Sequence, residues 1–155
     1  MKTRRVIVSS LLLIATLGLW AKSSEAGGDT IVVIVNNANP AKSLSAVDLR
    51  PIFQTTKTSW SSGGEAVPFN LPDDNPLRQD FDQAVLGLDK ERASRYWQDR
   101  KIRGGARPPK QLSSTGAALR AVAGSAGGVG YVKASEVNAS VKVVAKIVAG
   151  KVSGP

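Results

Sequence analysis

The sequence predicts a single α/β domain in which helices cover a mixed or mostly parallel β-sheet. A continuous β-branched run, TIVVIV at 30–35, opens the region, and two apolar strand-like runs close it. Between them lie one short strand pattern and four segments with helical spacing or helix-capping residues. Strands and helices that alternate in this way are typical of helices packed against a sheet.

The N-terminal segment has the features of a secretory signal peptide. Three basic residues precede an apolar run at 6–21, and a small-residue site ends at Ala26. This order is typical of a cleaved signal. The alternative is a retained membrane anchor, but the run is shorter than the roughly 20 residues that a membrane-spanning helix needs. We therefore expect a signal peptide at 1–26 and one domain at 27–155, periplasmic or otherwise exported.

The charge and the missing residue types limit the classes of function that we expect. Removal of the signal takes away four basic residues and one acidic residue, so the net charge falls from +9 to +6. This favours anions, but no basic run is interleaved with aromatic residues, so we expect no nucleic-acid partner. The absence of cysteine and histidine removes thiolate chemistry, the commonest general base and ordinary zinc ligands. With no catalytic motif present, we expect a non-enzyme without cofactor or metal.

The first elements follow from β-propensity and capping. The run at 30–35 suits a strand buried on both faces, the first and central one. A helix with a capping box begins after Ser45, and Pro51 predicts that it is kinked or split into two short turns. The polar segment 54–65 is a loop, which we expect Trp60 to anchor to the core in preference to stacking on a ligand.

The second helix has the clearest signals. A short strand at 66–70 precedes it, and Pro68 in that strand is best tolerated at an edge or a bulge. Asn75 is a good N-cap and Pro76 occupies the favoured first position, while Gly87 ends or bends the helix. Its apolar face consists of Leu77, Phe81, Ala84, Val85 and Leu88.

A third helix is predicted from Asp89, with Ala93 on its inner face. We expect Tyr96 and Trp97 to lie in the core that the second helix shares. Glycines, prolines and cations make 103–110 a loop.

The C-terminal part alternates between helix and strand. Hydroxyl residues at 113–115 cap a fourth helix. The glycine-rich turn at 124–130 then leads into a strand at 129–132, and the last strand is at 141–148. Because this turn leads into a strand, it is not the dinucleotide-binding motif, which opens a helix.

The start of the second helix is the first candidate site. A helix N-terminus offers free N–H donors and partial positive charge, which suit phosphate or sulfate, and Asn75 and Arg78 lie there. Pro76 removes one donor, and the carboxylates of Asp73 and Asp74 repel an anion. The alternative, in which the two acids only stabilise the helix, stays open.

The start of the fourth helix is the second candidate. Ser113, Ser114 and Thr115 follow a cationic loop that contains Arg107, and together they could form an anion cradle. The alternative is an ordinary hydroxyl cap.

A family resemblance runs from about residue 31 to 132. Its marks are Val35-Asn36, Leu49-Arg50-x-Ile52-Phe53, Trp60, Val67-Pro68-Phe69-Asn70, Arg78-x-x-Phe81, Tyr96-Trp97 and Gly127-Gly-Val-Gly-Tyr131-Val. In this order they resemble short, single-lobe members of the periplasmic phosphate-binding-protein-like superfamily of solute-binding proteins.

The resemblance implies one lobe of a periplasmic-binding-protein-like α/β fold. It also implies an exported solute-binding-like protein that takes phosphate or another small oxyanion for an ABC transporter. The alternative function is an envelope interaction or sensing subunit that keeps the scaffold and binds a protein partner.

We predict that export removes residues 1–26, because a charged start, an apolar run and a small-residue site occur in the required order. Intact-mass measurement of protein from the cell envelope should find a chain that begins near residue 27. A species that retains Met1 and partitions with membranes would contradict this expectation.

Overall fold

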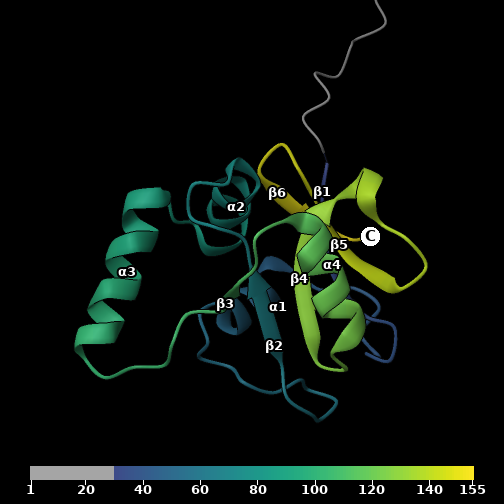
Figure 1. Cartoon of the computed structure of the whole chain (residues 1–155), viewed down its shortest axis with the longest axis horizontal. Coiled ribbons are helices and arrows are strands. Elements are labelled where there is room, and N and C mark those ends of the chain that lie inside the picture. The colour runs from purple at the N-terminus through teal and green to yellow at the C-terminus, as the bar shows by residue number, and fades with distance from the viewer. Residues whose placement is uncertain (1–29) are drawn as a thin grey trace, which may run out of the picture.

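The computed structural model describes residues 30–155, which form a six-stranded mixed sheet flanked by four α-helices (Figure 1). This confirms the predicted fold class. The expected signal peptide falls outside the described residues and stays a prediction. From residue 30 onward, no helix has the length and apolar character needed to cross a membrane.

The sheet has the strand order β3-β2-β4-β1-β5-β6. Its strands are β1 (Ile31–Asn36), β2 (Val67–Asn70), β3 (Lys110–Gln111), β4 (Gly128–Lys133), β5 (Val141–Val148) and β6 (Lys151–Ser153). Strand β1 pairs antiparallel with β4 and β5, whereas β2 pairs parallel with β3 and β4. The sheet is therefore mixed and not mostly parallel. The predicted central strand is confirmed, because β1 lies between two partners and its first five residues are buried.

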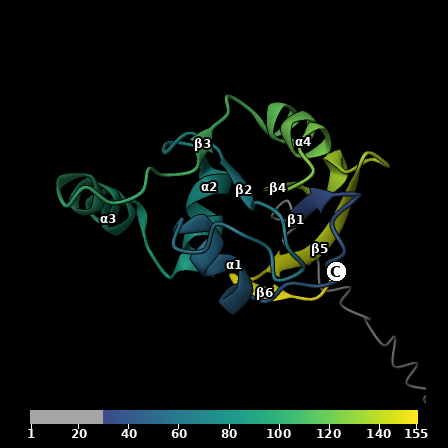
Figure 2. The ribbon, with the colours of Figure 1, turned by 90° about the horizontal axis from the view of Figure 1, so that it is seen from below.

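The helices are α1 (Ala46–Phe53), α2 (Pro76–Phe81), α3 (Lys90–Ile102) and α4 (Thr115–Gly124). A π-helical turn, η1 (Asp82–Leu86), continues α2, and a 3₁₀ turn, η2 (Ala134–Glu136), follows β4. Figure 2 shows α4 and α1 on opposite sides of the sheet. Both views place α3 at the end of the molecule that is farthest from α4 and β5.

Helix α1 begins with the predicted capping box. The Asp48 N–H donates to Ser45 Oγ at 3.3 Å, and the Ser45 N–H donates to Asp48 Oδ2 at 2.9 Å. Pro51 lies inside α1, which is one continuous helix and not two short turns. The helix tolerates Pro51 because it comes two residues before the end, and the carbonyl it leaves unbonded belongs to Val47, which is 77% exposed.

Helix α2 and η1 form the predicted second helical segment. Asn75 Oδ1 accepts a hydrogen bond from the Leu77 N–H at 2.9 Å, which confirms the N-cap. The chain then widens into the π turn and stops at Gly87, whose φ of 69° is a left-handed conformation that glycine adopts without strain. The predicted end of the segment is thereby confirmed.

Aromatic rings form the centre of the core. The rings of Phe81 and Tyr131 stack with their centroids 3.9 Å apart, and Phe53 meets Phe81 edge-on at 4.6 Å. Burial raises the pKa of the Tyr131 phenol, whose hydroxyl donates to Asn70 Oδ1 and accepts from the Leu71 N–H. These contacts join α1, α2, β2 and β4 in one cluster.

The loop after α1 is anchored as predicted. Trp60 is buried, and its Nε1–H donates to the carbonyl of Gly127 at 3.1 Å. A Cβ at Gly127 would lie 1.9 Å from the Glu65 carbonyl oxygen, so only glycine permits this approach of two backbones.

Pro68 sits beside β4 but has no partner on its other side, because β3 pairs only with Phe69 and Asn70. The structure thus places it at a local edge of the sheet, as expected.

The expectation that Tyr96 and Trp97 belong to the core is wrong. Both are half-buried, and Ala93 is the one residue of α3 that is buried. Seven of the 13 residues of α3 are charged, so the helix has no apolar stripe wide enough to pack against the sheet. Trp97 instead lines a cavity.

We predict that Phe81→Ala lowers the free energy of unfolding by about 3 to 5 kcal/mol, because the ring is fully buried between two other rings. Urea unfolding measures the loss. Ile102→Ala is the matched control, since its side chain is 84% exposed and its loss should cost less than about 0.5 kcal/mol. Equal effects of the two substitutions would contradict the assignment of the core.

Candidate ligand-binding cleft

A cavity of about 780 Å³ lies between α3 and α2. One wall consists of α3 residues that recur at helical spacing, namely Lys90, Ala93, Ser94, Trp97 and Lys101. The other walls come from α2, the start of η1, the loop before α2, the loop before β3, and Gln111 of β3. The cleft therefore has opposing walls from segments that are separate in the sequence.

A buried ion-pair cluster forms the wall opposite α3. Arg78 is 4% exposed; its Nε donates to Asp82 Oδ2 at 3.1 Å and its Nη1 to the Leu71 carbonyl at 2.8 Å. Nη1 also lies 2.5 Å from Asp73 Oδ1. Within residues 30–155 the structure gives no hydrogen bond to Nη2, and Arg78 is one of the residues that line the cavity.

Asp73 lies at the outer side of this cluster. Its Oδ1 also accepts a hydrogen bond from Gln111 Nε2 at 3.0 Å, while its side chain is 67% exposed. The carboxylate thus occupies a small cradle made of an arginine and an amide donor. Asp74, which the sequence grouped with it, does not line the cavity.

Asp82 is the buried carboxylate of the cluster. Its Oδ1 has no hydrogen-bond partner among the described residues. Burial raises the pKa of Asp82, and the neighbouring Arg78 opposes this effect without cancelling it. Two carboxylates therefore share one guanidinium, and the charged form of Asp82 is held at a cost in free energy.

Three further cations surround the cavity: Lys90, Lys101 and Arg107. None of them has an ion pair with any residue that the structure describes. With Arg78 they make four cations against the two carboxylates of Asp73 and Asp82, so the lining carries a net charge of +2. A concave surface of one prevailing charge concentrates ligands of the opposite charge.

Some of the predicted site residues line the cavity, and others only cap helices. It brings Arg78 and Arg107, which come from the two separate candidate sites, to one cavity. Asn75 caps α2, and Ser114 caps α4 by accepting from the Ala117 N–H at 3.2 Å. Ser113 is exposed, and neither serine lines the cavity.

The start of α4 holds a carboxylate that the sequence analysis missed. Glu136 Oε1 accepts from the Thr115 hydroxyl at 2.5 Å, and its Oε2 accepts from the Lys133 N–H at 3.1 Å. Glu136 lies 21 residues after Thr115, so no local pattern signals the contact. The hydroxyl predicted to join an anion cradle thus already binds an internal anion.

The cavity also contains residues that the sequence analysis did not single out, namely Lys90, Lys101 and Asp82. The helical spacing of Lys90 and Lys101 was visible, but α3 was expected to pack its aromatic residues into the core; Asp82 belongs to η1. The position of α3 at the end of the molecule leaves Trp97 on a cavity.

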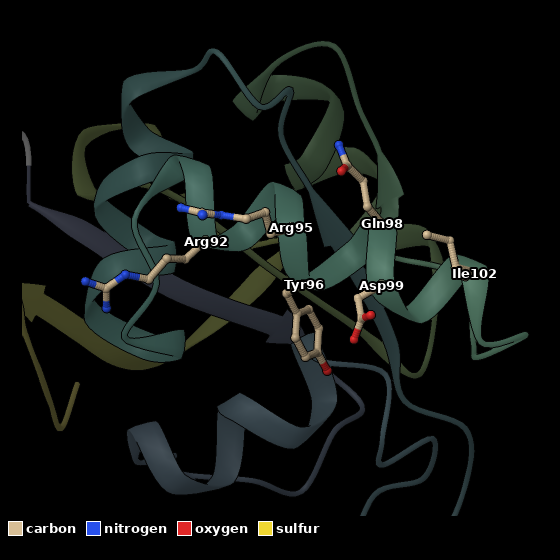
Figure 3. Close-up of a pocket in the computed structure, with 6 residues that line it drawn as sticks. All are labelled: Arg92, Arg95, Tyr96, Gln98, Asp99 and Ile102. Carbon is tan, nitrogen blue, oxygen red and sulfur yellow. The ribbon is translucent and has the colours of Figure 1, made fainter.

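A second depression of about 560 Å³ lies on the other face of α3 (Figure 3). All six residues that line it belong to α3, so it has no opposing wall. We therefore do not place a site there. Across residues 30–155 there is also no group of three or more acidic, cysteine or histidine side chains that could hold a metal.

No family model and no curated protein matches the chain. Solved structures do match its fold. The chain aligns with a protein from Clostridium perfringens, described as a phosphate ABC transporter substrate-binding protein with bound phosphate, at a TM-score of 0.61 and 24% identity. It aligns with an ABC-type phosphate transport receptor from Vibrio cholerae at 0.60 and 18%, and with PstS from Borrelia burgdorferi at 0.59 and 11%. The fold is that of a single periplasmic-binding-protein-like lobe.

Each of these alignments covers 75% of this chain but only 44 to 46% of the solved chain. The chain therefore spans less than half the length of the proteins that it matches. At these identities the likeness concerns the fold, and the described functions are those of the solved proteins.

We predict that the stability of the wild type relative to an Asp82→Asn variant falls as the pH rises. Because burial raises the pKa of Asp82, its contribution is fully present below about pH 4, the ordinary range of an Asp carboxyl. This contribution to stability is lost as the pH rises through the higher pKa that Asp82 has in the folded state. Urea unfolding of both proteins from pH 3 to pH 8 measures the difference, and a relative stability that increases with pH would mean that the Arg78 ion pair outweighs burial.

Proposed function

We propose that this protein is an exported solute-binding-like protein that takes a small oxyanion in the cleft between α2 and α3. The observation that carries the proposal is the gathering of four cations around one cavity, three of them without an ion pair in the described part of the chain. Guanidinium and ammonium groups are the side chains that recognise phosphate and related anions.

The ion-pair cluster at Arg78 holds one of the ligand-binding groups in a fixed orientation. Its guanidinium is fixed by three acceptors, so a ligand that meets Nη2 finds a donor that needs no further ordering. Arg107 and the two lysines add charge from the exposed side. Because they are exposed, their attraction is screened over about 8 to 10 Å at ordinary ionic strength, and we expect modest, salt-dependent affinity.

Asp73 acts in this proposal as an internal occupant of the site. Its carboxylate holds Arg78 Nη1 and Gln111 Nε2, two donors that would also suit an oxyanion. An incoming anion must displace it or bind beside it. Loss of the negative charge at Asp73 therefore removes a competitor as well as a repulsion.

The solved structures support the ligand class and the partner. The Clostridium perfringens protein has bound phosphate, and it and the Vibrio cholerae protein are described as parts of phosphate transport systems. By this likeness the proposed ligand is phosphate or another small oxyanion, and the proposed partner is an ABC transporter. The structural neighbours are described as transport and binding proteins, which agrees with a non-enzymatic role.

A second candidate function is the envelope interaction subunit. One feature favours it: the outer face of α3 exposes Tyr96 in part and Ile102 almost fully, and α3 stands at the end of the molecule. Such a face is open to a protein partner. Titration with small anions separates the two functions.

We predict that calorimetric titration of the purified protein detects phosphate or sulfate at millimolar concentration or below. Asp73→Asn should tighten binding several-fold, because a competing carboxylate becomes neutral, whereas Arg107→Ala should weaken it. Arg95→Ala is the matched control, since Arg95 is exposed on α3 and pairs with Glu91 away from the cavity. If no anion binds, the solute-binding function fails and the interaction subunit becomes the better account. If an anion binds but neither Asp73→Asn nor Arg107→Ala changes its affinity, the cleft is not the binding site.

A further inference from the structure

We propose that the ligand of this cleft is an organic oxyanion with a flat aromatic body, which stacks on Trp97 while its anionic group meets Arg78 and Arg107. This inference rests on the proposed function and specifies the class of ligand that the same site takes.

The size of the cleft is the first argument. Its volume is about 780 Å³, which falls in the range of roughly 300 to 1,000 Å³ typical of sites for organic ligands. Inorganic phosphate has five non-hydrogen atoms, and at about 30 Å³ for a water-sized group it fills on the order of 100 to 150 Å³. A cation-lined cleft of this size therefore has room for a ligand body as well as an anionic group.

The second argument is the placement of Trp97. An indole is among the largest apolar groups a protein can bury, yet this one lies on a strongly charged helix, outside the core, and Trp97 is one of the residues that line the cavity. Ala93, Ala106 and Pro108 line the cavity with it. These small apolar groups lie in a cleft whose other lining is mostly charged or polar, and they give an uncharged ligand body a surface to contact.

The ring of Trp97 is also held in position. Tyr96 meets it edge-on with centroids 4.9 Å apart, and the guanidinium carbon of Arg100 lies 5.7 Å from the centroids of both rings. Arg100 is fixed in turn, because its Nη1 donates to the Gln54 carbonyl at 2.6 Å and to the Tyr96 hydroxyl at 2.8 Å. A ring that is ordered before binding loses little entropy when a ligand stacks on it.

The chemistry of the ligand follows from these two surfaces. An indole ring stacks on planar aromatic groups whatever their substituents. The guanidinium groups pair with an oxyanion such as a phosphate ester, sulfonate or carboxylate. Aryl phosphates, aryl sulfonates and nucleoside monophosphates all carry both parts. Inorganic phosphate has the anionic group but no aromatic ring, so it offers nothing that stacks on Trp97.

The test compares phenyl phosphate, ethyl phosphate and inorganic phosphate as ligands of the purified protein, by calorimetry and by quenching of tryptophan fluorescence. We expect phenyl phosphate to bind at least tenfold more tightly than ethyl phosphate, which corresponds to about 1.4 kcal/mol. Trp97→Ala should abolish that difference, so that phenyl phosphate and ethyl phosphate bind this variant with equal affinity. Trp97→Phe should keep most of it, and Arg95→Ala, on the other face of α3, should match the wild type.

The outcomes separate the two proposals. If all three phosphates bind with equal affinity, or if Trp97→Ala preserves the preference for the phenyl ester, the aromatic inference is overturned while oxyanion binding stands. If phenol binds as tightly as phenyl phosphate, the oxyanion part is overturned. If none of the phosphates binds, the proposed function fails, and the inference fails with it. Because Trp97 lies outside the core, its substitutions should fold, which unchanged thermal unfolding would verify.

Discussion

The buried guanidinium of Arg78 is the constraint on which the rest of the cleft depends. It joins the end of β2 to both ends of the α2 segment, because its three acceptors come from Leu71, Asp73 and Asp82. A buried charge of this kind is stable only when its partners are in place, and removal of one partner typically costs about 3 to 5 kcal/mol. The position of α2, and with it one wall of the cavity, is therefore tied to a polar cluster at the margin of the aromatic core. Leu71 links the cluster to that core, because its carbonyl accepts from Arg78 and its N–H donates to the Tyr131 hydroxyl.

Internal carboxylates occupy two places where the sequence suggested external anions. Asp73 binds Arg78 beside α2, and Glu136 binds Thr115 at the start of α4. In each case the chain satisfies its own donors. Three of the cations that line the cleft, Lys90, Lys101 and Arg107, have no ion pair among the described residues, and they lie on α3 and the loop after it.

The sequence predicted the elements whose signals are local. The strand at 30–35, the Ser45, Asn75 and Ser114 caps and the stop at Gly87 all depend on residues within one turn of each other, and the structure bears them out. Strands β3 and β6 were missed, because two or three residues give no periodicity. Trp97 was wrongly predicted to lie in the core, because the spacing of residues along α3 does not reveal which part of the molecule each face of this helix contacts. The contacts of Glu136 with Thr115 and of Gln111 with Asp73 join distant segments, so only the fold reveals them.

The short strands have a consequence for how the molecule behaves in solution. Both edges of the sheet are formed by very short strands, two residues in β3 and three in β6, and each edge begins with a lysine. A long, flat edge would present a row of unpaired backbone groups on which another chain could add as a strand, whereas short and charged edges prevent this. The apolar strand β1 lies inside the sheet and pairs with β4 on one side and β5 on the other, whereas β6 covers only residues 146–148 of β5. A chain without disulfides thus keeps its most apolar strand, β1, away from other molecules by the order of its strands.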